Sequence, residues 1–469
     1  MRWENDGLGK LEIPPHAYFG IHTLRAIENF DVSGYRLRQS FISSFATVKR
    51  ACAITNLELG YLEKPRGAAI IAACEEIESG AFHDHVLVDA FQGGAGTSTN
   101  MNLNEVIANR AVEILGAEKG DYSVAHPIDD VNMHQSTNDV YPTALRVTAL
   151  RLLKELEVEV TALQESLQHK EAEFRDFVKT GRTQLQDAAP ITLGMEFGAY
   201  AEAISRDRWR IFKARERVRQ VNLGGTAVGT GLGAPKDYIF RVVENLRLIT
   251  GLNVSRAENL VDATQNADTF VEVSGMLKAL ASNLFKIASD IRLLSCGPNA
   301  GIAEIRLPPV QAGSSIMAGK INPVIPEMVS QVALRVMSND QIIGLVAALG
   351  QLELNQFLPL LAHSLIESLE ILSRSCRLFS EKCVRGIEPD ANRSRQLLMN
   401  STIVATALVP VIGYENVEKI VKKAQSEQKT VMDVAVNEGF LTEERAKRFL
   451  APERLYKLGF DRNEDDELG

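Results

Sequence analysis

The sequence lacks several features that mark secreted and membrane proteins. Its five cysteines are odd in number and scattered without a CxxC pair, so neither a disulfide framework nor a cysteine zinc site is indicated. It has no apolar run of about 18 residues, as a membrane-spanning helix requires. The polar N-terminal stretch MRWENDGLGKLEIPP lacks the apolar segment of a signal peptide. We therefore expect a cytoplasmic protein with reduced thiols and no membrane partner.

Basic runs and common catalytic motifs are also missing. The formal net charge is −9 and no Lys/Arg-rich run occurs, so no nucleic-acid partner is expected. The glycine-rich GGTAVGTGLG (224–233) matches neither phosphate-binding loop pattern, and we expect a tight turn or a close helix contact there. HDH (83–85) suggests a metal site, but it lies in a polar stretch with no HExxH or cysteine cluster to support it. We therefore predict no metal and no cofactor.

What the sequence does contain is mostly helical periodicity. Its 469 residues are 45% apolar and 24% charged, which is typical of a soluble globular protein with several domains. The stretch after Pro142 up to Val178 has neither glycine nor proline and predicts one long helix. Apolar spacing predicts further helices over 41–60, 101–115, 190–221, 264–296, 323–349 and 351–383. Several very long helices in succession predict an elongated bundle.

The chain is expected to form three domains. Residues 1–138 predict a mostly helical N-terminal domain whose first 35 residues form loops and short pieces. Residues 139–390 predict the central long-helix bundle. A change of composition near 386–392 introduces a small C-terminal helical domain, 391–469, in which Thr442 is a plausible helix start. The acidic last nine residues are expected to fray.

One long apolar segment predicts an oligomer. Residues 323–372 carry only six charged side chains: Glu327, Arg335, Asp340, Glu353, Glu367 and Glu370. A long helix that is apolar around most of its circumference must be buried on most sides. We expect the helices of partner subunits to cover it, and the alternative is a large core within one chain.

Four stretches rich in glycine or hydroxyl groups interrupt the helical pattern: QGGAGTSTNMNLNE (92–105), HQSTND (134–139), GRTQLQDAAP (181–190) and GSSIMAGKINPVIPE (313–327). Each has an ordinary interpretation, because Ser, Thr, Asn and Asp commonly cap helices. Together they offer neutral donors and backbone N–H groups near helix N-termini, with Lys320 as a cation. Such groups attract anions. The combination suits a small polycarboxylate.

The same stretches resemble a known family. GSSIMAGKIN is similar to the GSSxMPxKxN signature of the aspartase/fumarase superfamily. Other family motifs occur along the chain in the family's order: AYFGIHTLRAIENF, VNMHQSTNDVYPT, GTAVGTGL and ELNQF. Where fumarases typically read QSSND, GRTHLQD and KVNPTQCE, this chain reads QSTND, GRTQLQD and KINPVIPE. The sequence therefore resembles the aspartase branch. Ala318, Val409 and QFLP (356–359) depart from what relatives commonly carry.

The resemblance implies a mainly all-α fold of three domains with a central long-helix bundle and a little strand in the N-terminal domain. It implies a homotetramer with active sites built from three subunits. It also implies conversion of L-aspartate to fumarate and ammonium, without a cofactor. The alternatives are a fumarase, a related amino-dicarboxylate lyase, or a structural, crystallin-like member of the same fold.

The resemblance also implies roles for individual residues. Ser314 would be the catalytic base, with a pKa depressed by backbone N–H groups, by Lys320 and by the helix that begins near Pro323. Gln184 would position the substrate ammonium without donating a proton, because ammonia needs no acid to leave. The other substrate-binding residues would be Thr97, Ser136, Thr137 and Ser315 on the reacting carboxylate, Lys320 and Asn322 on the second carboxylate, and Asn138 and Thr183.

Overall fold

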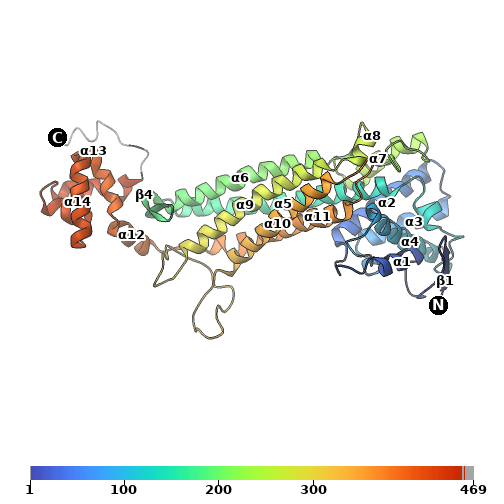
Figure 1. Ribbon diagram of the computed structural model, residues 1–469, viewed down its shortest axis with the longest axis horizontal. Helices are drawn as coiled ribbons and strands as arrows, with labels where there is room; N and C mark the ends of the chain where they lie inside the picture. Colours follow the sequence, from blue (N-terminus) through green and yellow to red (C-terminus); the bar gives the residue numbers. More distant parts are fainter. Residues whose placement is uncertain (1, 457–458, 460–469) are drawn as a thin grey trace. The chain divides into compact units, whose positions relative to one another are not determined.

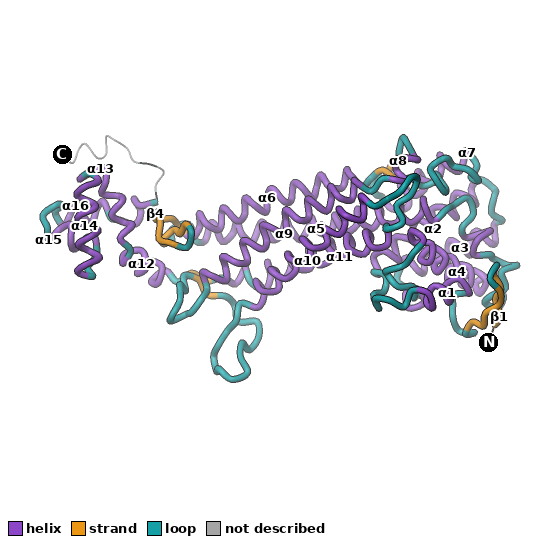
Figure 2. Tube along the Cα trace, viewed as in Figure 1, coloured by secondary structure: helices purple, strands orange, loops and turns teal. Residues whose placement is uncertain are grey.

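The computed structural model describes residues 2–456 and Gly459, and it is mainly helical, as predicted (Figures 1 and 2). The chain divides into two compact units, which are described separately. Unit 1 comprises Met1–Val158, Asp207–Ser282 and Val332–Ser373, and unit 2 comprises Glu159–Arg206, Asn283–Gln331 and Arg374–Gly469. The division into domains at residues 138 and 390 stays a prediction. The predicted acidic tail lies outside the described residues.

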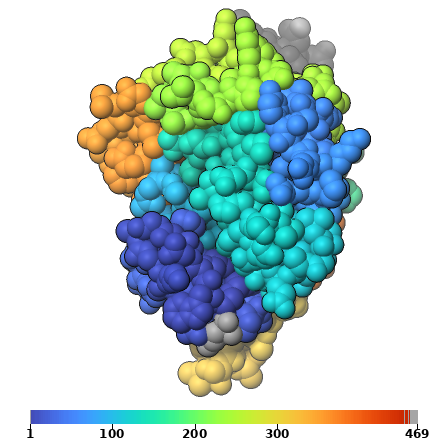
Figure 3. Space-filling view, turned by 90° about the vertical axis from the view of Figure 1, so that its right-hand side faces the viewer, coloured from blue at the N-terminus to red at the C-terminus, as the bar shows by residue number. Residues whose placement is uncertain are grey.

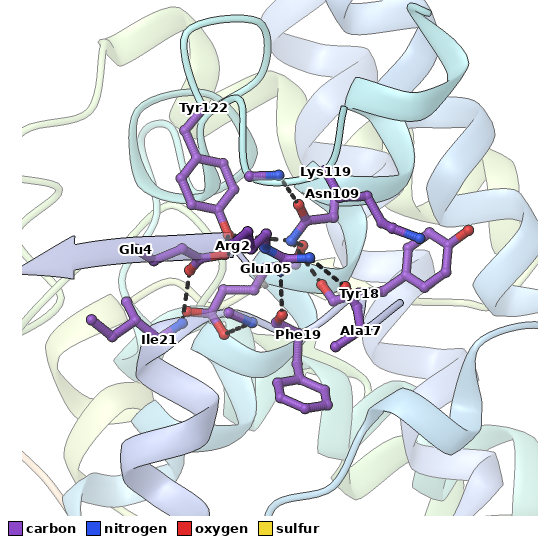
Figure 4. A network of polar contacts seen from close by, with 12 residues as sticks. Arg2, Glu4, Ala17, Tyr18, Phe19, Ile21, Glu105, Asn109, Lys119 and Tyr122 are labelled. Carbon is purple, nitrogen blue, oxygen red and sulfur yellow. Dashed lines mark hydrogen bonds and ion pairs between the residues drawn. The ribbon is translucent and has the colours of Figure 1, made fainter. Parts of the chain in front are cut away.

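Unit 1 begins with an antiparallel hairpin of β1 (Arg2–Asp6) and β2 (Gly9–Ile13), the strand expected near the N-terminus. The helices that follow are α1 (Ile21–Asn29), α2 (Gln39–Glu58), α3 (Lys64–Glu78) and α4 (Thr97–Ile114). The buried carboxylate of Glu105 on α4 accepts hydrogen bonds from the backbone N–H groups of Gly20 and His22, each at 2.8 Å. Glu4 accepts from the N–H of Ile21 at 2.8 Å (Figure 4). These carboxylates satisfy the otherwise unpaired donors at the start of α1.

Five long helices each contribute residues to both units: α5 (Thr137–Glu173), α6 (Leu193–Arg217), α9 (Asp268–Leu294), α10 (Val324–Ala348) and α11 (Leu358–Lys382). In unit 1 the Ser274 hydroxyl donates to Asp340 at 2.8 Å, which joins α9 to α10. In unit 2 the Tyr200 hydroxyl donates to Asp290 at 2.9 Å, which joins α6 to α9. The bundle helices predicted from periodicity are therefore present.

The predicted connection between the first two long helices is wrong in kind. Residues 181–190 were expected to link helices, with the first helix reaching Val178 and the second starting at Pro190. Instead α5 ends at Glu173, and β3 (Val178–Thr183) pairs with β4 (Gln186–Thr192) in an antiparallel hairpin. Pro190 lies in β4, where a two-stranded sheet tolerates its missing N–H.

Two other predicted helices start later than expected. The 264–296 segment is split after α8 (Leu260–Gln265), and the 351–383 helix begins at Leu358 after a turn. Apart from the C-terminal helices, the remaining elements are one helix, two short strand pairs and five short helices. The helix is α7 (Lys236–Thr250), and the strand pairs are the parallel β5 (Gln220–Val221) and β6 (Ser255–Arg256) and the antiparallel β7 (Ile305–Arg306) and β8 (Glu388–Pro389). The short helices are η1 (His83–His85), η2 (Gly94–Gly96), η3 (Pro127–Val131), η4 (Val384–Gly386) and η5 (Thr402–Leu408).

The C-terminal part of unit 2 has its own apolar core. Its helices are α12 (Ala391–Asn400), α13 (Val409–Ile412), α14 (Tyr414–Glu427), α15 (Val431–Asn437), α16 (Glu443–Phe449) and α17 (Pro452–Leu455). Buried Leu408, Ile420 and Phe449 belong to one hydrophobic cluster. Thr442 caps α16 as predicted, because its hydroxyl accepts from the N–H of Arg445 at 3.3 Å.

The five cysteines form no disulfide, and four of them are buried. Burial raises the pKa of the Cys52 and Cys383 thiols to about 12, and Cys296 is only partly buried. In the described part of the chain no single helix is long and apolar enough to cross a membrane; taken together, the bent pair Ala391–Asn400 and Thr402–Ile412 meets the criteria of length and composition.

Candidate active site

The first group of predicted site residues lies in unit 1, where α4 begins. Gly96 precedes this helix with φ at 97°, a left-handed conformation that favours glycine. A Cβ atom at this position would lie 2.2 Å from a ring carbon of Tyr141 on α5, so only glycine allows this close approach. Thr97 follows as the first helical residue and is exposed, with its hydroxyl donating to the Gly94 carbonyl at 2.8 Å.

Residues 136–138 form the start of α5. The Ser136 hydroxyl accepts from the N–H of Asn138 at 3.2 Å, the pattern of an N-terminal cap. The side-chain amide of Asn100, one turn after Thr97, donates to the Thr137 hydroxyl at 3.1 Å. The first turn of α4, which carries Thr97, is therefore joined to the start of α5, which carries Ser136, Thr137 and Asn138. Backbone donors at two helix N-termini favour an anion.

Asp139 fixes the backbone of this segment. Its fully buried carboxylate accepts from the N–H groups of Ser136 at 3.0 Å, and of Gly224 and Thr226 at 3.1 Å each. Burial raises the pKa of Asp139 to about 6, and these backbone donors oppose that shift. The Asn138 amide adds a bond to the Ala227 carbonyl at 2.8 Å. The glycine-rich 224–233 stretch is therefore a turn packed against the start of α5, on the face of unit 1 where cyan and yellow-green segments meet (Figure 3).

Pro142 lies inside α5 and has a compensating partner. A proline cannot donate the helical hydrogen bond to the carbonyl four residues earlier. That carbonyl belongs to Asn138, and it accepts instead from the side-chain amide of Asn222 at 2.9 Å. The same amide donates to the Thr264 hydroxyl at 2.9 Å. Asn222 thus anchors a predicted site residue to the glycine-rich turn.

A buried lysine on α2 binds the residues that precede the 136–138 segment. The ammonium of Lys49 donates to the side-chain carbonyls of Asn132 at 2.9 Å and Gln135 at 2.8 Å. Asn132 also accepts from Asn100 at 3.1 Å, which continues the chain of bonds to Thr137. Burial lowers the pKa of Lys49 to about 8. Sequence reasoning missed Lys49; its position in the apolar ATVKRACA run was the available signal.

The second group lies in unit 2 at the tip of the β3–β4 hairpin. Thr183 pairs with Gln186, so Gln184 and Leu185 form a two-residue turn. Their φ angles are 53° and 61°, as in a type I′ turn, although neither residue is Gly, Asn or Asp. Thr183 and Gln184 are both exposed.

The third group is the 313–322 loop of unit 2. The Ser314 hydroxyl oxygen accepts from the backbone N–H groups of Met317 at 2.9 Å and Ile316 at 3.2 Å. The side-chain amide of Asn322 donates to the Gly313 carbonyl, and the Lys320 N–H donates to the Met317 carbonyl at 3.3 Å. These bonds fold the loop on itself. Ser315 and Lys320 are exposed.

The structure thus places the predicted residues in three groups. Among the described residues of unit 2, no hydrogen bond joins the hairpin tip to the 313–322 loop. Nor does the described part of the chain contain a cluster of three or more His, Cys, Asp or Glu residues arranged as a metal site. What the groups supply is hydroxyl, amide and backbone N–H donors, together with one exposed ammonium. Such groups can hold a dicarboxylate and stabilise negative charge that develops on it.

Comparisons with known proteins identify the relatives of this chain. The model of a family described as "Lyase" matches residues 9–338, and that of the "Fumarase C C-terminus" matches residues 404–457. The aspartate ammonia-lyase of Bacillus subtilis (strain 168) is 46% identical over 458 residues, covering 98% of this chain and 96% of that protein.

Two solved structures share the fold. The fumarate lyase:delta crystallin from Brucella melitensis bound to cobalt has a TM-score of 0.93 and 47% identity, covering 97% of this chain and all (100%) of that chain. The class II fumarase from Schistosoma mansoni has a TM-score of 0.91 and 33% identity, covering 96% of this chain and 98% of that chain.

Proposed function

We propose a function from one premise: the chain belongs to the lyase family that includes aspartases and fumarases. It is an ammonia-lyase, and the reaction that we assign to it is the reversible deamination of L-aspartate to fumarate and ammonium. The observation that carries the mechanism is the pair of backbone N–H groups at 2.9 and 3.2 Å from the Ser314 oxygen. Two such donors stabilise an alkoxide more than a neutral hydroxyl, so they lower the pKa of the serine.

The proposed reaction has two steps. The Ser314 alkoxide takes a proton from the carbon beside the β-carboxylate, and the electron pair of that C–H bond moves into the carboxylate to give an aci-carboxylate. When this intermediate collapses, the C=C bond of fumarate forms and the C–N bond breaks. The nitrogen leaves with the bonding electrons as ammonia, which takes up the proton from Ser314 as ammonium.

The first step puts a second negative charge on one carboxylate. Thr97, Ser136, Thr137 and Ser315 would donate hydrogen bonds to it, and fixed donors of this kind stabilise developing charge without reorganising. Lys320 and Asn322 would hold the second carboxylate in position. The bonds that fix Thr137 and the 136–138 backbone in unit 1 support a preformed site for the reacting carboxylate.

Gln184 supports aspartate over malate as substrate. Expulsion of hydroxide from malate benefits from a general acid, whereas ammonia leaves from an ammonium that is already protonated. A glutamine side chain cannot act as that acid, but its carbonyl accepts a hydrogen bond from an ammonium. Thr183 and Gln184 at the hairpin tip, with Asn138, would therefore hold the amino group.

We also propose a homotetramer in which three subunits build each site. On α10 Leu334 and Leu345 are 54% and 67% exposed, and Leu349 directly after the helix is 53% exposed, although the helix has few charges. A monomer rarely leaves such an apolar row in water. The division of the predicted residues into three groups supports their completion by other copies. Cysteines that form no disulfide support a cytoplasmic location, in which thiols stay reduced.

The test is a substrate panel on the purified protein: aspartate, malate, 3-methylaspartate and argininosuccinate, followed by the absorbance of the unsaturated product. We expect fumarate to form from aspartate far faster than from malate. Similar kcat/KM values for the two would favour a fumarase. No product from any of the four would favour a structural, crystallin-like protein, against which the intact Ser314, Lys320 and Asn322 argue.

A matched control removes contaminating host enzyme as an explanation. Ser314→Ala, expressed and purified in the same way, should show no more than a trace of the wild-type rate. Equal rates in both preparations, with the same rate in a mock preparation from host cells that lack the gene, would assign the activity to a contaminant.

A further inference from the structure

The hairpin tip in unit 2 has an unfavourable backbone. Gln184 and Leu185 both lie in the left-handed region, which costs free energy for side chains other than Gly, Asn and Asp. The side chain of Leu185 is also 70% exposed, so apolar burial does not offset that cost. Such a turn persists only when the surrounding structure holds it.

A buried ionic cluster lies at the base of this tip. The carboxylate of Glu304, which is 0% exposed, accepts from both terminal nitrogens of the Arg182 guanidinium at 3.0 Å each. The ammonium of Lys179, also on β3, lies 3.0 Å from the same carboxylate and 2.9 Å from that of Glu196. Two cations and two anions therefore balance. Arg182 is the residue immediately before Thr183, so the cluster reaches the tip directly.

Glu304 is itself held by its backbone. Its N–H donates to the Leu294 carbonyl at the end of α9 at 2.9 Å, and its carbonyl accepts from the Asp390 N–H at 2.8 Å. The next residue, Ile305, begins β7 and pairs with Pro389 of β8. The carboxylate thus projects from a fixed point within unit 2 onto the hairpin.

A second bond restrains the other side of the hairpin. The Ser401 hydroxyl donates to the Asp187 carboxylate at 2.6 Å, just after Gln186 closes the turn. Gly181 allows the strands to approach, because a Cβ atom there would lie 2.5 Å from the Ala189 carbonyl oxygen. The ladder shifts register between Thr180 and Arg182, which aims the Arg182 side chain at Glu304.

We infer that Glu304 is a positioning residue of the lyase reaction: through Arg182 and Lys179 it holds the Thr183–Gln184 tip in the conformation that receives the substrate amino group. This rests on the proposed function. The ordinary alternative is a buried ion pair that serves only stability. A buried salt bridge is weak evidence for stability, since apolar replacements are often as stable. Glu304 binds Arg182, which directly precedes Thr183, and the strained turn of Gln184 and Leu185 lies just beyond. These two features favour a positioning role.

The test uses the reverse reaction, in which ammonium and fumarate are separate substrates. Glu304→Gln keeps the size of the side chain and one acceptor oxygen but loses the paired carboxylate. We expect its KM for ammonium to rise about tenfold or more, while its KM for fumarate stays within about threefold. The matched control is Glu196→Gln, which loses a partner of Lys179 but no contact with Arg182. Both of its KM values should stay within about threefold of the wild type.

The strained turn allows a rescue experiment. Glycine adopts the left-handed region readily, so Leu185→Gly should let the turn form without the ionic support. The double variant Glu304→Gln/Leu185→Gly should recover a KM for ammonium within about threefold of that of Leu185→Gly alone. Equal rises of both KM values in Glu304→Gln, with no rescue, would assign the pair a purely structural role and overturn the proposal.

Hydrogen exchange provides a measurement that does not need activity. In peptides that cover residues 178–192, amide exchange should be faster in Glu304→Gln than in the wild type, and unchanged in Glu196→Gln. Unchanged exchange in Glu304→Gln would overturn the inference. If the wild type made no aspartate at all, the proposed function would fail, while this comparison would still show whether Glu304 holds the hairpin. If Glu304→Gln failed to fold, Arg182→Lys, which keeps the charge but loses the paired geometry, would be measured in the same two ways.

Discussion

The start of α5 in unit 1 and the 313–322 loop in unit 2 both carry predicted site residues, but they are built differently. At the start of α5, the backbone of Ser136 is bound to a carboxylate with no exposed surface, and Thr137 is bound to an asparagine linked to a buried lysine. In the 313–322 loop the hydrogen bonds of the Ser314 and Asn322 side chains lie within the loop itself, and Ile316 is 88% exposed.

The difference separates two tasks. Donors that stabilise a developing charge must not move, because reorganising them during the reaction would cost free energy. A base must instead reach a carbon–hydrogen bond after the substrate has entered, and a loop with glycines can close over it. We therefore expect changes in the loop to affect the rate without affecting the fold, and changes at the start of α5 to affect both. Three predictions test this contrast, and a fourth concerns a buried carboxyl elsewhere in unit 1.

The largest effect is expected from Ser314→Ala. Removing the base should lower kcat roughly 10⁴-fold, the upper range for a general base. The melting temperature and the oligomeric state should not change, because the hydroxyl bonds only within its own loop. Turnover at saturating aspartate and the thermal melt are the measurements. Ser315→Ala should lose roughly 10²- to 10³-fold, as one donor among several. Turnover of Ser314→Ala within tenfold of the wild type would place the base elsewhere.

Lys320→Met should have the next largest effect. It removes the exposed ammonium that is proposed to pair with a carboxylate and to depress the Ser314 pKa. Because a hydrogen bond to a charged group contributes about 1.5–3 kcal/mol, we expect KM for aspartate to rise roughly 10- to 100-fold and kcat to fall as well. Lys320→Arg keeps the charge and should lose less. A fall in kcat with unchanged KM would remove Lys320 from substrate binding.

Asp139→Asn tests the start of α5, the buried one of the two regions. The substitution keeps one acceptor oxygen but turns an NH₂ group toward backbone N–H donors. Leaving buried donors unpaired costs about 1–3 kcal/mol, so the melting temperature should fall and kcat/KM should drop about tenfold. The control is Asp129→Asn, whose side chain is 82% exposed, and neither quantity should change. Lost activity at an unchanged melting temperature would show that the two effects are separable here, against our expectation.

The smallest effect concerns Glu105, which ends the 92–105 stretch and is buried on α4, two turns after Thr97. Burial raises its pKa from 4.5 to about 7, and the hydrogen bonds from Thr23, Gly20 and His22 oppose that shift. Between these pH values the folded state binds the proton more tightly than the unfolded state does. The free energy of unfolding should therefore decrease as the pH rises from about 4.5 to about 7.

Glu105→Gln removes this titration. Melting temperatures measured at pH 5 and pH 7.5 should differ less in the variant than in the wild type, while kcat stays within about twofold. Parallel pH dependence in both proteins would mean that Glu105 does not titrate in this range.

The long helices were predictable because their signal is local. Apolar spacing and the lack of glycine and proline after Pro142 are properties of neighbouring residues, and α5 and α10 follow from them. The β3–β4 hairpin was not predictable in the same way. Its turn contains Gln184 and Leu185, where sequence reasoning looks for Asn-Gly, and its support comes from Glu304, more than a hundred residues later.

The candidate site divides along the same line. Its hydroxyl and amide residues stand out in the sequence because they lie in stretches that break the apolar periodicity of the helices. The groups that hold them do not stand out, since Asp139, Lys49 and Asn222 act through partners that only the fold supplies. A sequence shows which groups could contact a ligand, whereas the supporting bonds depend on distant segments meeting.

The uneven burial of the cysteines has a practical consequence. With Cys52, Cys74, Cys376 and Cys383 inside the core, Cys296 is the thiol that a maleimide dye should reach first in the folded protein. Its sulfur accepts from the N–H of Ile302, and its carbonyl accepts from that of Ala303, next to Glu304. A fluorophore attached there would report by its emission on the segment that leads into β7, without any cysteine having to be introduced or removed.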